Sequence, residues 1–186
     1  MAQHVSGGNE LLDAPAILTE QLGLETAKVV ADLGCGGAAF FTLAAAKIVG
    51  DQGQVYAVDI LKTVLSSADS KAKLHNLYNI KTVWSNIEVL GATTIPEGSV
   101  DYAFLVNTLF QSKQHEAIFQ EAIRLLKPQG KILVIDWDKE VQGIGPAAED
   151  RVDPELIRQI ARDQGLSEIK NFRAGQYHFG MVFSKV

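Results

Sequence analysis

The amino-acid sequence predicts an α/β domain built on a mostly parallel β-sheet with helices on both faces. From residue 28 onward, apolar runs of strand length alternate with segments of helical period, as expected when helices connect parallel strands. Near the C-terminus, two strand-like runs are separated only by Ala174 and Gly175, which is too short for a crossover helix and predicts an antiparallel pair. With 186 residues, the chain is expected to form one domain over 1–186, with residues 1–12 flexible.

The predicted elements follow one another in a regular order. Asp13 and Pro15 open a first helix, which Gly23 stops and which is expected to lie across an edge of the domain. Parallel strands are expected at 28–33, 54–59, 80–84, 100–107 and 131–136. Helices are expected between them at 38–49, 61–72 and 113–127, the last one stopped by Pro128, Gln129 and Gly130.

The C-terminal third begins with a long loop, expected over 137–152. Asp153 and Pro154 then supply an N-cap and a first helical position, opening a helix that ends near Gly165. The antiparallel pair is expected at 168–173 and 176–185.

Composition narrows the function classes. Acidic residues outnumber basic ones by 22 to 17, a net charge of −5, which disfavours nucleic acid because phosphate backbones are held by clustered Lys and Arg. A single cysteine, Cys35, excludes an intramolecular disulfide and a clustered-thiol metal site, and no metal site is predicted. The N-terminus lacks a signal-peptide pattern and no apolar run reaches the ~20 residues of a membrane span. A cytoplasmic protein is therefore expected.

The most informative segment runs from Val30 to Ala38, where a strand leads into glycines and then a helix. Glycines let a ligand approach the backbone closely, and a helix N-terminus offers N–H groups to a negative group. Gly34, Gly36 and Ala39 satisfy the relaxed dinucleotide fingerprint, and Asp59 follows at the expected distance of about 20 residues. This spacing does not decide between a dinucleotide and S-adenosylmethionine.

Asp32 favours S-adenosylmethionine over a dinucleotide. Its carboxylate is expected at the end of the first strand, two residues before the first glycine, where it would repel a pyrophosphate. The same carboxylate would attract the ammonium group of a methionine moiety. S-adenosylmethionine is therefore the predicted cofactor.

Three segments carry a resemblance to a known family. They are 32–38 (Asp-Leu-Gly-Cys-Gly-Gly-Ala), 58–59 (Val-Asp) and 125–134 (Leu-Leu-Lys-Pro-Gln-Gly-Lys-Ile-Leu-Val). They resemble the class I, Rossmann-like, S-adenosylmethionine-dependent methyltransferases, in particular the compact group that includes quinone-biosynthesis and arsenite methyltransferases. The resemblance implies a seven-stranded sheet with an antiparallel last strand. Ala38 departs from the family pattern, which usually has a third glycine there.

The resemblance also implies which residues bind the cofactor. Those expected along its methionine part and sulfonium are Asp32, Gly34, Cys35, Gly36 and Asn107. Those expected at the ribose and adenine are Asp59, Ile60, Asn86 and Ile87. Within these sets, Asp32 is expected near the amino group, Asp59 at the ribose hydroxyls, and Asn86 as acceptor from the adenine amino group.

The predicted activity is methyl transfer to a small organic molecule. The cofactor already carries an activated methyl group, so the protein chiefly aligns the acceptor, and no catalytic residue is assigned. The run Asn107-Thr-Leu-Phe110 lacks the Asn-Pro-Pro-aromatic pattern of amino-group methyltransferases, and one cysteine disfavours arsenite. The alternative is a chain that binds the cofactor but serves as an inactive partner or regulatory module. The sequence assigns no oligomeric state.

The methyl acceptor is expected at strand ends, between 107–110, 136–137 and the loop 138–152. Phe110 and Trp137 either face the acceptor or close the core, and His178 is the one histidine that could face a site. Charged residues of the helix at 113–127 are interpreted as its solvated face: Glu116, Glu121, Arg124 and Lys127.

Overall fold

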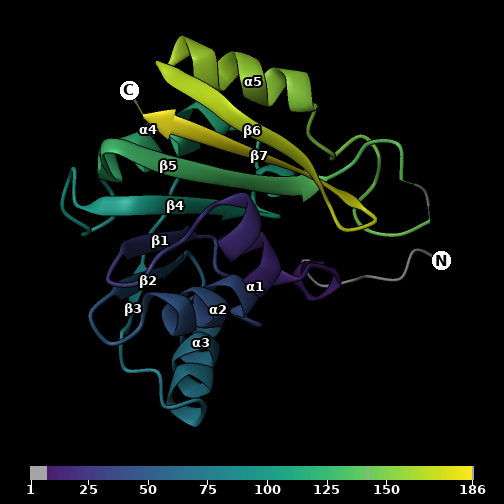
Figure 1. Ribbon diagram of the computed structural model, residues 1–186. Coiled ribbons are helices and arrows are strands. Elements are labelled where there is room, and N and C mark those ends of the chain that lie inside the picture. Colours follow the sequence, from purple (N-terminus) through teal and green to yellow (C-terminus); the bar gives the residue numbers. More distant parts are fainter. Residues whose placement is uncertain (1–7, 142, 186) are drawn as a thin grey trace.

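The sheet of the computed structural model, which describes residues 8–141 and 143–185, has seven strands in the order β3-β2-β1-β4-β5-β7-β6 (Figure 1). Strands β1 to β5 are parallel, and β7 is antiparallel to both β5 and β6. The strands are β1 Val29–Leu33, β2 Gln54–Asp59, β3 Ile80–Trp84, β4 Val100–Val106, β5 Leu126–Trp137, β6 Leu166–Ala174 and β7 His178–Lys185. The predicted mostly parallel sheet with an antiparallel last strand is confirmed.

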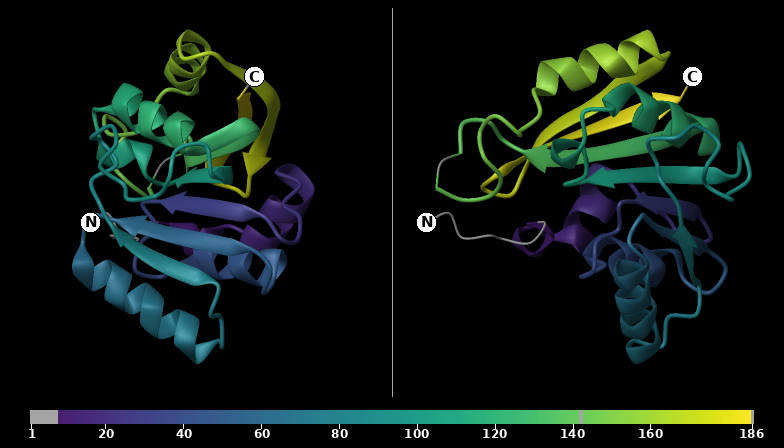
Figure 2. Two further views of the ribbon diagram at one scale, coloured as in Figure 1. Left: turned by 90° about the vertical axis from the view of Figure 1, so that its left-hand side faces the viewer. Right: turned by 180° about the vertical axis from the view of Figure 1, so that it is seen from behind.

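Helices cover both faces of the sheet, as predicted (Figure 2). Helices α1, α2 and α3 pack on one face, and α4 and α5 pack on the other. The helices are α1 Ala14–Ala16 with its π-helical continuation η2 Ile17–Gln21, α2 Phe40–Val49, α3 Lys62–Leu74, α4 His115–Leu125 and α5 Pro154–Asp163, and two short 3₁₀ turns are η1 Asn9–Leu11 and η3 Leu109–Gln111. Among the residues described, no helix has the length and apolar character needed to cross a bilayer.

Strand β4 shows how the sequence builds both layers of the core. Tyr102 and Phe104 pack with α2, where the rings of Phe41 and Phe104 meet edge to face at 6.4 Å. Ala103 and Leu105 point to the opposite layer, with α4 and α5. Successive side chains of a strand face opposite sides, and both sides of a central parallel strand are buried. Its sequence is therefore a nearly continuous run of apolar residues.

The N-terminal helix lies over a face of the sheet, and its predicted position across an edge is wrong. Leu18 and Leu22 are buried in the same cluster as Val30 and Phe104. The helix start is as predicted, since the Asp13 carboxylate accepts from the Ala16 N–H at 3.1 Å. Burial of two leucines against the sheet fixes the helix over its face.

Helix α4 ends at Leu125 and β5 begins at Leu126, so the predicted helix end at Lys127 is wrong. Leu126 pairs with Val100, and the register then shifts before the Tyr102 pair. Pro128 therefore lies inside the strand, at an irregularity, rather than after a helix end. A bulge tolerates proline because the missing N–H interrupts no regular ladder bond there.

The loop predicted over 137–152 begins one residue later, because Trp137 still belongs to β5, and the described residues of 138–152 contain neither helix nor strand. Buried Arg151 organises it by donating to four loop carbonyls, those of Asp138, Val141, Ile144 and Pro146. Asp153 then caps α5, accepting from the Glu155 N–H at 2.9 Å.

Part of the segment 1–12, predicted to be flexible, lies outside the described residues, namely 1–7. Of the remainder, Leu12 is buried, and Gly8 packs so closely on Trp137 that a Cβ there would lie 2.3 Å from its ring.

Helix α2 begins at Phe40 rather than at the predicted Ala38, because Ala39 has a φ of 53°.

Candidate functional site

A pocket of about 720 Å³ opens at the C-terminal ends of β1 to β4. Six residues of the predicted cofactor site line it: Gly34, Gly36, Asp59, Ile60, Asn86 and Ile87. Thr108, in the segment 107–110 predicted for the acceptor, also lines it. Further lining residues come from η1, α3 and the loops after β3 and β4, and were not predicted as site residues: Asn9, Glu10, Ser67, Lys71, Ser85, Glu88, Gln111 and Ser112 among them. Ligands of open α/β sheets bind outside the carboxyl ends of the strands, where this pocket lies.

The other three predicted site residues, Asp32, Cys35 and Asn107, are buried and do not line the pocket. The Asp32 carboxylate accepts from the Thr42 hydroxyl at 2.5 Å. Asn107 donates from Nδ2 to Oδ1 of Asn9 at 2.7 Å, while its own Oδ1 has no hydrogen-bond partner in the part of the chain described. Cys35 lies between the lining residues Gly34 and Gly36, and Asn107 precedes Thr108. Asp32 lies close enough to Asp59 to feel its charge.

The glycine loop after β1 exposes its backbone to the pocket. Gly36 has a φ of 65°, and a Cβ placed on it or on Gly37 would meet no atom within 4 Å. Gly34 is constrained differently, since a Cβ there would lie 2.8 Å from the Thr108 hydroxyl. Glycine at 34 thus permits the close approach of two strand ends, and the later glycines leave the backbone open to a ligand.

Helix α3 fixes the same loop from the side. The Ser67 hydroxyl and the Lys71 ammonium both donate to the carbonyl oxygen of Gly37, at 2.9 and 2.6 Å. Their spacing of one helical turn is the sequence signal that places them on one face, but nothing in the sequence marks Gly37 as their partner.

Asp59, at the end of β2, lines the pocket beside the glycine loop. Its carboxylate accepts from the Gly36 N–H at 3.3 Å and from the Leu61 N–H at 2.9 Å. An ionised carboxylate offers about four acceptor positions, so both oxygens can still accept from a ligand hydroxyl.

Two buried carboxylates lie beneath the strand ends. Burial raises the pKa of Asp32 to about 6, with a smaller contribution from the charge of Asp59. Burial likewise raises the pKa of Asp136 to about 7, against the hydrogen bonds it accepts from the N–H groups of Trp137, Phe110 and Leu109. Within residues 8–141 and 143–185, neither carboxylate forms an ion pair. Their negative charge, once formed, therefore favours a cationic ligand group above them.

Cys35 is not a nucleophile in this site. Its thiol is buried, and burial raises its pKa, with further contributions from the charges of Asp32 and Asp59. The thiol stays protonated at neutral pH, whereas nucleophilic cysteines act as thiolates.

The aromatic residues expected near the acceptor lie outside the pocket lining. Trp137 is fully buried and stacks on His178 with ring centroids 4.3 Å apart, so it closes the core. Phe110 is half-buried against the cluster beneath α4. No described residue of the loop 138–152 lines the pocket.

His178 is buried, and neither ring nitrogen has a hydrogen-bond partner among the described residues. Burial lowers its pKa to about 4, and the charge of Arg151 adds to the shift. A histidine whose folded pKa is lowered stabilises the fold above its unfolded pKa of ~6.5, and this stability is lost as the pH falls through about 4.

Replacing His178 by phenylalanine is therefore expected to remove a pH dependence. Between pH 7 and pH 5, the free energy of unfolding of the variant should rise relative to the parent protein by roughly 2 kcal/mol. Urea titrations at both pH values measure it, with exposed His75→Gln as control. Parallel pH profiles for parent and His178→Phe would contradict the burial of a neutral histidine.

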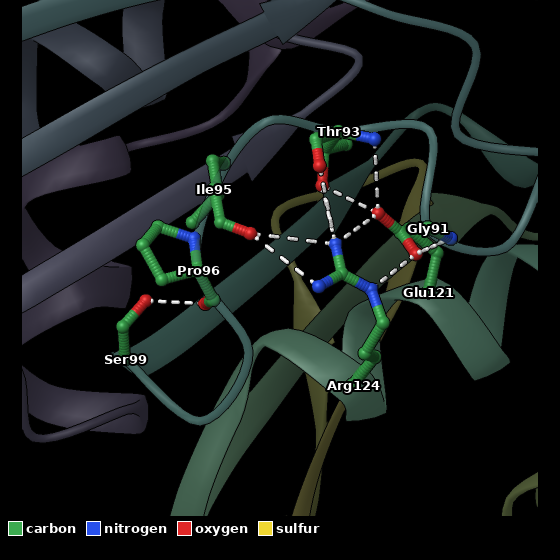
Figure 3. Close-up of polar contacts among 7 residues, drawn as sticks. All are labelled: Gly91, Thr93, Ile95, Pro96, Ser99, Glu121 and Arg124. Atoms are coloured by element: carbon green, nitrogen blue, oxygen red, sulfur yellow. Dashed lines mark hydrogen bonds and ion pairs between the residues drawn. The ribbon is translucent and has the colours of Figure 1, made fainter.

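Glu121 is fully buried, so its assignment to the solvated face of α4 is wrong. The loop after β3 folds over this part of the helix, and the Glu121 carboxylate accepts from the N–H groups of Gly91 and Thr93 (Figure 3). Lys127, also assigned to that face, pairs with Asp101 at 2.9 Å.

A family model described as a methyltransferase domain matches residues 24–174. The chain belongs to this methyltransferase family. Both the family and the Rossmann-like fold predicted from the sequence are confirmed. The chain is similar to a SAM-dependent methyltransferase from Aquifex aeolicus, whose crystal structure matches with a TM-score of 0.86 at 26% identity, over 97% of this chain and 94% of that one.

Curated relatives of this chain are longer. The demethylmenaquinone methyltransferase of Geobacillus sp. (strain WCH70) is 27% identical over 117 residues, which cover 63% of this chain and 48% of that protein. The chain thus spans about half the length of the curated relatives it matches. The [4+2]-cyclase SpnF shares the fold, with a TM-score of 0.76 at 15% identity over 92% of this chain and 79% of that one.

Proposed function

We propose that this chain is a methyltransferase that uses S-adenosylmethionine to methylate a small organic molecule. The observation that carries the proposal is the charge of the pocket, which combines an open glycine backbone with Asp59 at its wall and Asp32 behind it. Sulfonium and ammonium groups are favoured by such carboxylates, and a pyrophosphate is not. The family match and the SAM-dependent Aquifex protein support the cofactor, and the Geobacillus relative supports a small-molecule acceptor.

The residues present fit this cofactor. The glycine loop leaves room for its carboxylate to approach the backbone at Gly36 and Gly37, and the acceptors Asp32 and Asn107 Oδ1 suit its ammonium group. Asp59 would accept from the ribose hydroxyls, and Asn86 and Ile87 would hold the adenine. When bound, the cofactor supplies a methyl group already activated on a sulfonium.

The protein's own contribution is alignment of the two reactants. We place the acceptor at the pocket end formed by η1 and the loop after β4, with Glu10, Gln111 and Ser112. Asp136 holds the backbone of that loop through Leu109 and Phe110, so the loop keeps one position during transfer. We assign no general base.

The acidic composition of the chain bears on its partners. The net charge of −5 argues against nucleic acid as a partner, and we propose a cytoplasmic protein whose residues 1–186 act as one domain. A cofactor-binding but inactive regulatory module is the alternative, and the cyclase neighbour illustrates that this fold also hosts other chemistry.

Calorimetry tests the cofactor, and mass spectrometry tests the transfer. S-adenosylmethionine and S-adenosylhomocysteine are expected to bind at micromolar concentrations, while NAD and NADP do not bind. A panel of phenols, quinols, amines and carboxylic acids, incubated with S-adenosylmethionine, should then yield a product heavier by one methyl group. Tight dinucleotide binding would contradict the cofactor assignment. Cofactor binding without transfer to any acceptor would favour the regulatory module.

A further inference from the structure

The loop 85–95, which connects β3 toward β4, contributes Ser85, Asn86, Ile87 and Glu88 to the pocket. Between Ser85 and Thr93 none of its residues is buried, and Val89 and Leu90 are more than half exposed. Ile87 packs partly buried against the core, but apolar burial does not fix the rest of this part of the chain. Polar anchors must set its position.

One anchor is the Ser112 hydroxyl, which donates to Glu88, and the anchor at the far end of the loop is the carboxylate of Glu121 on α4. It accepts from the Gly91 N–H at 2.7 Å, from the Thr93 N–H at 3.2 Å and from the Thr93 hydroxyl (Figure 3). Both the Glu121 side chain and Thr93 are buried, so the Thr93 N–H would have no alternative partner in water if the carboxylate were lost.

Arg124, one turn further along α4, completes the cluster. Its Nε and Nη2 donate to the two oxygens of Glu121, at 2.9 and 2.7 Å, a bidentate pair that fixes the carboxylate plane. Nη2 also donates to the Thr93 hydroxyl at 2.8 Å. Burial alone would raise the pKa of Glu121, but the hydrogen bonds from Arg124 and Thr93 lower it to about 2, so the acceptor remains ionised.

The cluster is connected to the pocket by successive turns. The Ala92 N–H donates to the Val89 carbonyl at 3.0 Å, and the Val89 N–H donates to the Asn86 carbonyl at 3.3 Å. The Asn86 side chain in turn accepts from the Glu88 N–H at 2.9 Å. The positions of Gly91 and Thr93 therefore constrain the position of Asn86 through these turns.

We propose that the Glu121–Arg124 pair is a positioning element for cofactor binding, which holds the loop 85–95 where Asn86 and Ile87 meet the adenosine. The proposal rests on the proposed function, because it requires adenosine at this end of the pocket. Neither residue lines the pocket, so the pair acts through the loop alone.

The test measures affinity for two probes that share the adenosine, S-adenosylhomocysteine and 5′-methylthioadenosine. Calorimetry is done at a temperature where circular dichroism shows each variant fully folded. Glu121→Gln, Thr93→Val and Arg124→Lys should each weaken both probes by a similar factor, about tenfold for Glu121→Gln and about threefold for the other two. Glu116→Gln, an exposed change on the same helix, should leave both affinities unchanged.

Val182→Ala separates positioning from general stability. This buried residue of β7 lies on the opposite face of the sheet, so its truncation lowers stability without touching the loop, and affinity should be kept. If Glu121→Gln does not fold, the Thr93 and Arg124 variants decide. Wild-type affinity in all folded variants, loss for only one probe, or an equal loss in Val182→Ala would overturn the proposal. Failure of the unmodified protein to bind either probe would instead overturn the proposed function.

Discussion

Replacing Asp59 by alanine is expected to weaken the binding of S-adenosylhomocysteine by roughly 1.5–3 kcal/mol, the range for hydrogen bonds to a charged group. The carboxylate lines the pocket beside the glycine loop, and its removal also releases the Gly36 N–H. The fold should survive, since Asp59 is half-buried and forms no ion pair among the described residues. Calorimetry gives the affinity, and circular dichroism gives the fold.

Two further variants sharpen this prediction. Asp59→Asn keeps one acceptor oxygen but loses the charge, so its affinity should lie between those of the parent and of Asp59→Ala. Asp51→Ala, an exposed change in the turn after α2, should bind like the parent. An Asp59→Ala protein that is folded and binds with unchanged affinity would show that the ribose lies elsewhere.

The sheet was predictable because its signal is local and repeated. Strands such as 100–106 are buried on both faces and therefore appear as continuous apolar runs, and the Ala174-Gly175 link leaves no room for a crossover. The end of α4 was missed because Pro128 and Gly130 are also compatible with an irregular strand, and only the pairing of Leu126 with Val100 decides between them. Long-range pairing outweighs a local stop signal there.

The glycine loop and Asp59 were predictable as pocket residues because their chemistry follows from positions close in the sequence. Asn9 and Glu10 were not, since they reach the pocket through a contact with Asn107 across 98 residues. Glu121 was misassigned for a similar reason. Its charge suggests an exposed residue, although it lies three residues after Ile118 and four before Leu125 on the buried side of α4, where the loop 85–95 supplies its hydrogen-bond partners.

Replacing Asp32 by asparagine is expected to raise stability and lower cofactor affinity at the same time. Burial holds the folded pKa of Asp32 at about 6, above its ordinary value of 3.8. The folded state therefore binds the proton more tightly than the unfolded state does. The stability that this group contributes is fully present below pH 3.8 and is lost as the pH rises through about 6.

The rise in the pKa of Asp32 from 3.8 to about 6 corresponds to on the order of 3 kcal/mol at pH 8. The introduced asparagine side chain carries no charge, and its amide oxygen can still accept from Thr42. The free energy of unfolding of Asp32→Asn should thus exceed that of the parent at pH 8 by up to this amount, and the difference should vanish near pH 4. Urea titrations at pH 4, 6 and 8 measure it, with exposed Asp51→Asn as control.

Cofactor affinity should change in the opposite direction. Without the carboxylate, the ammonium group of the methionine part loses its counter-charge, and binding at pH 8 should weaken by roughly 1.5–3 kcal/mol. A stability difference that does not vary with pH would exclude the buried charge as its cause, and undiminished binding would place the ammonium group away from Asp32. A gain in stability combined with a loss of binding would mean that Asp32 is kept ionised in the core for its ligand, at the expense of the fold.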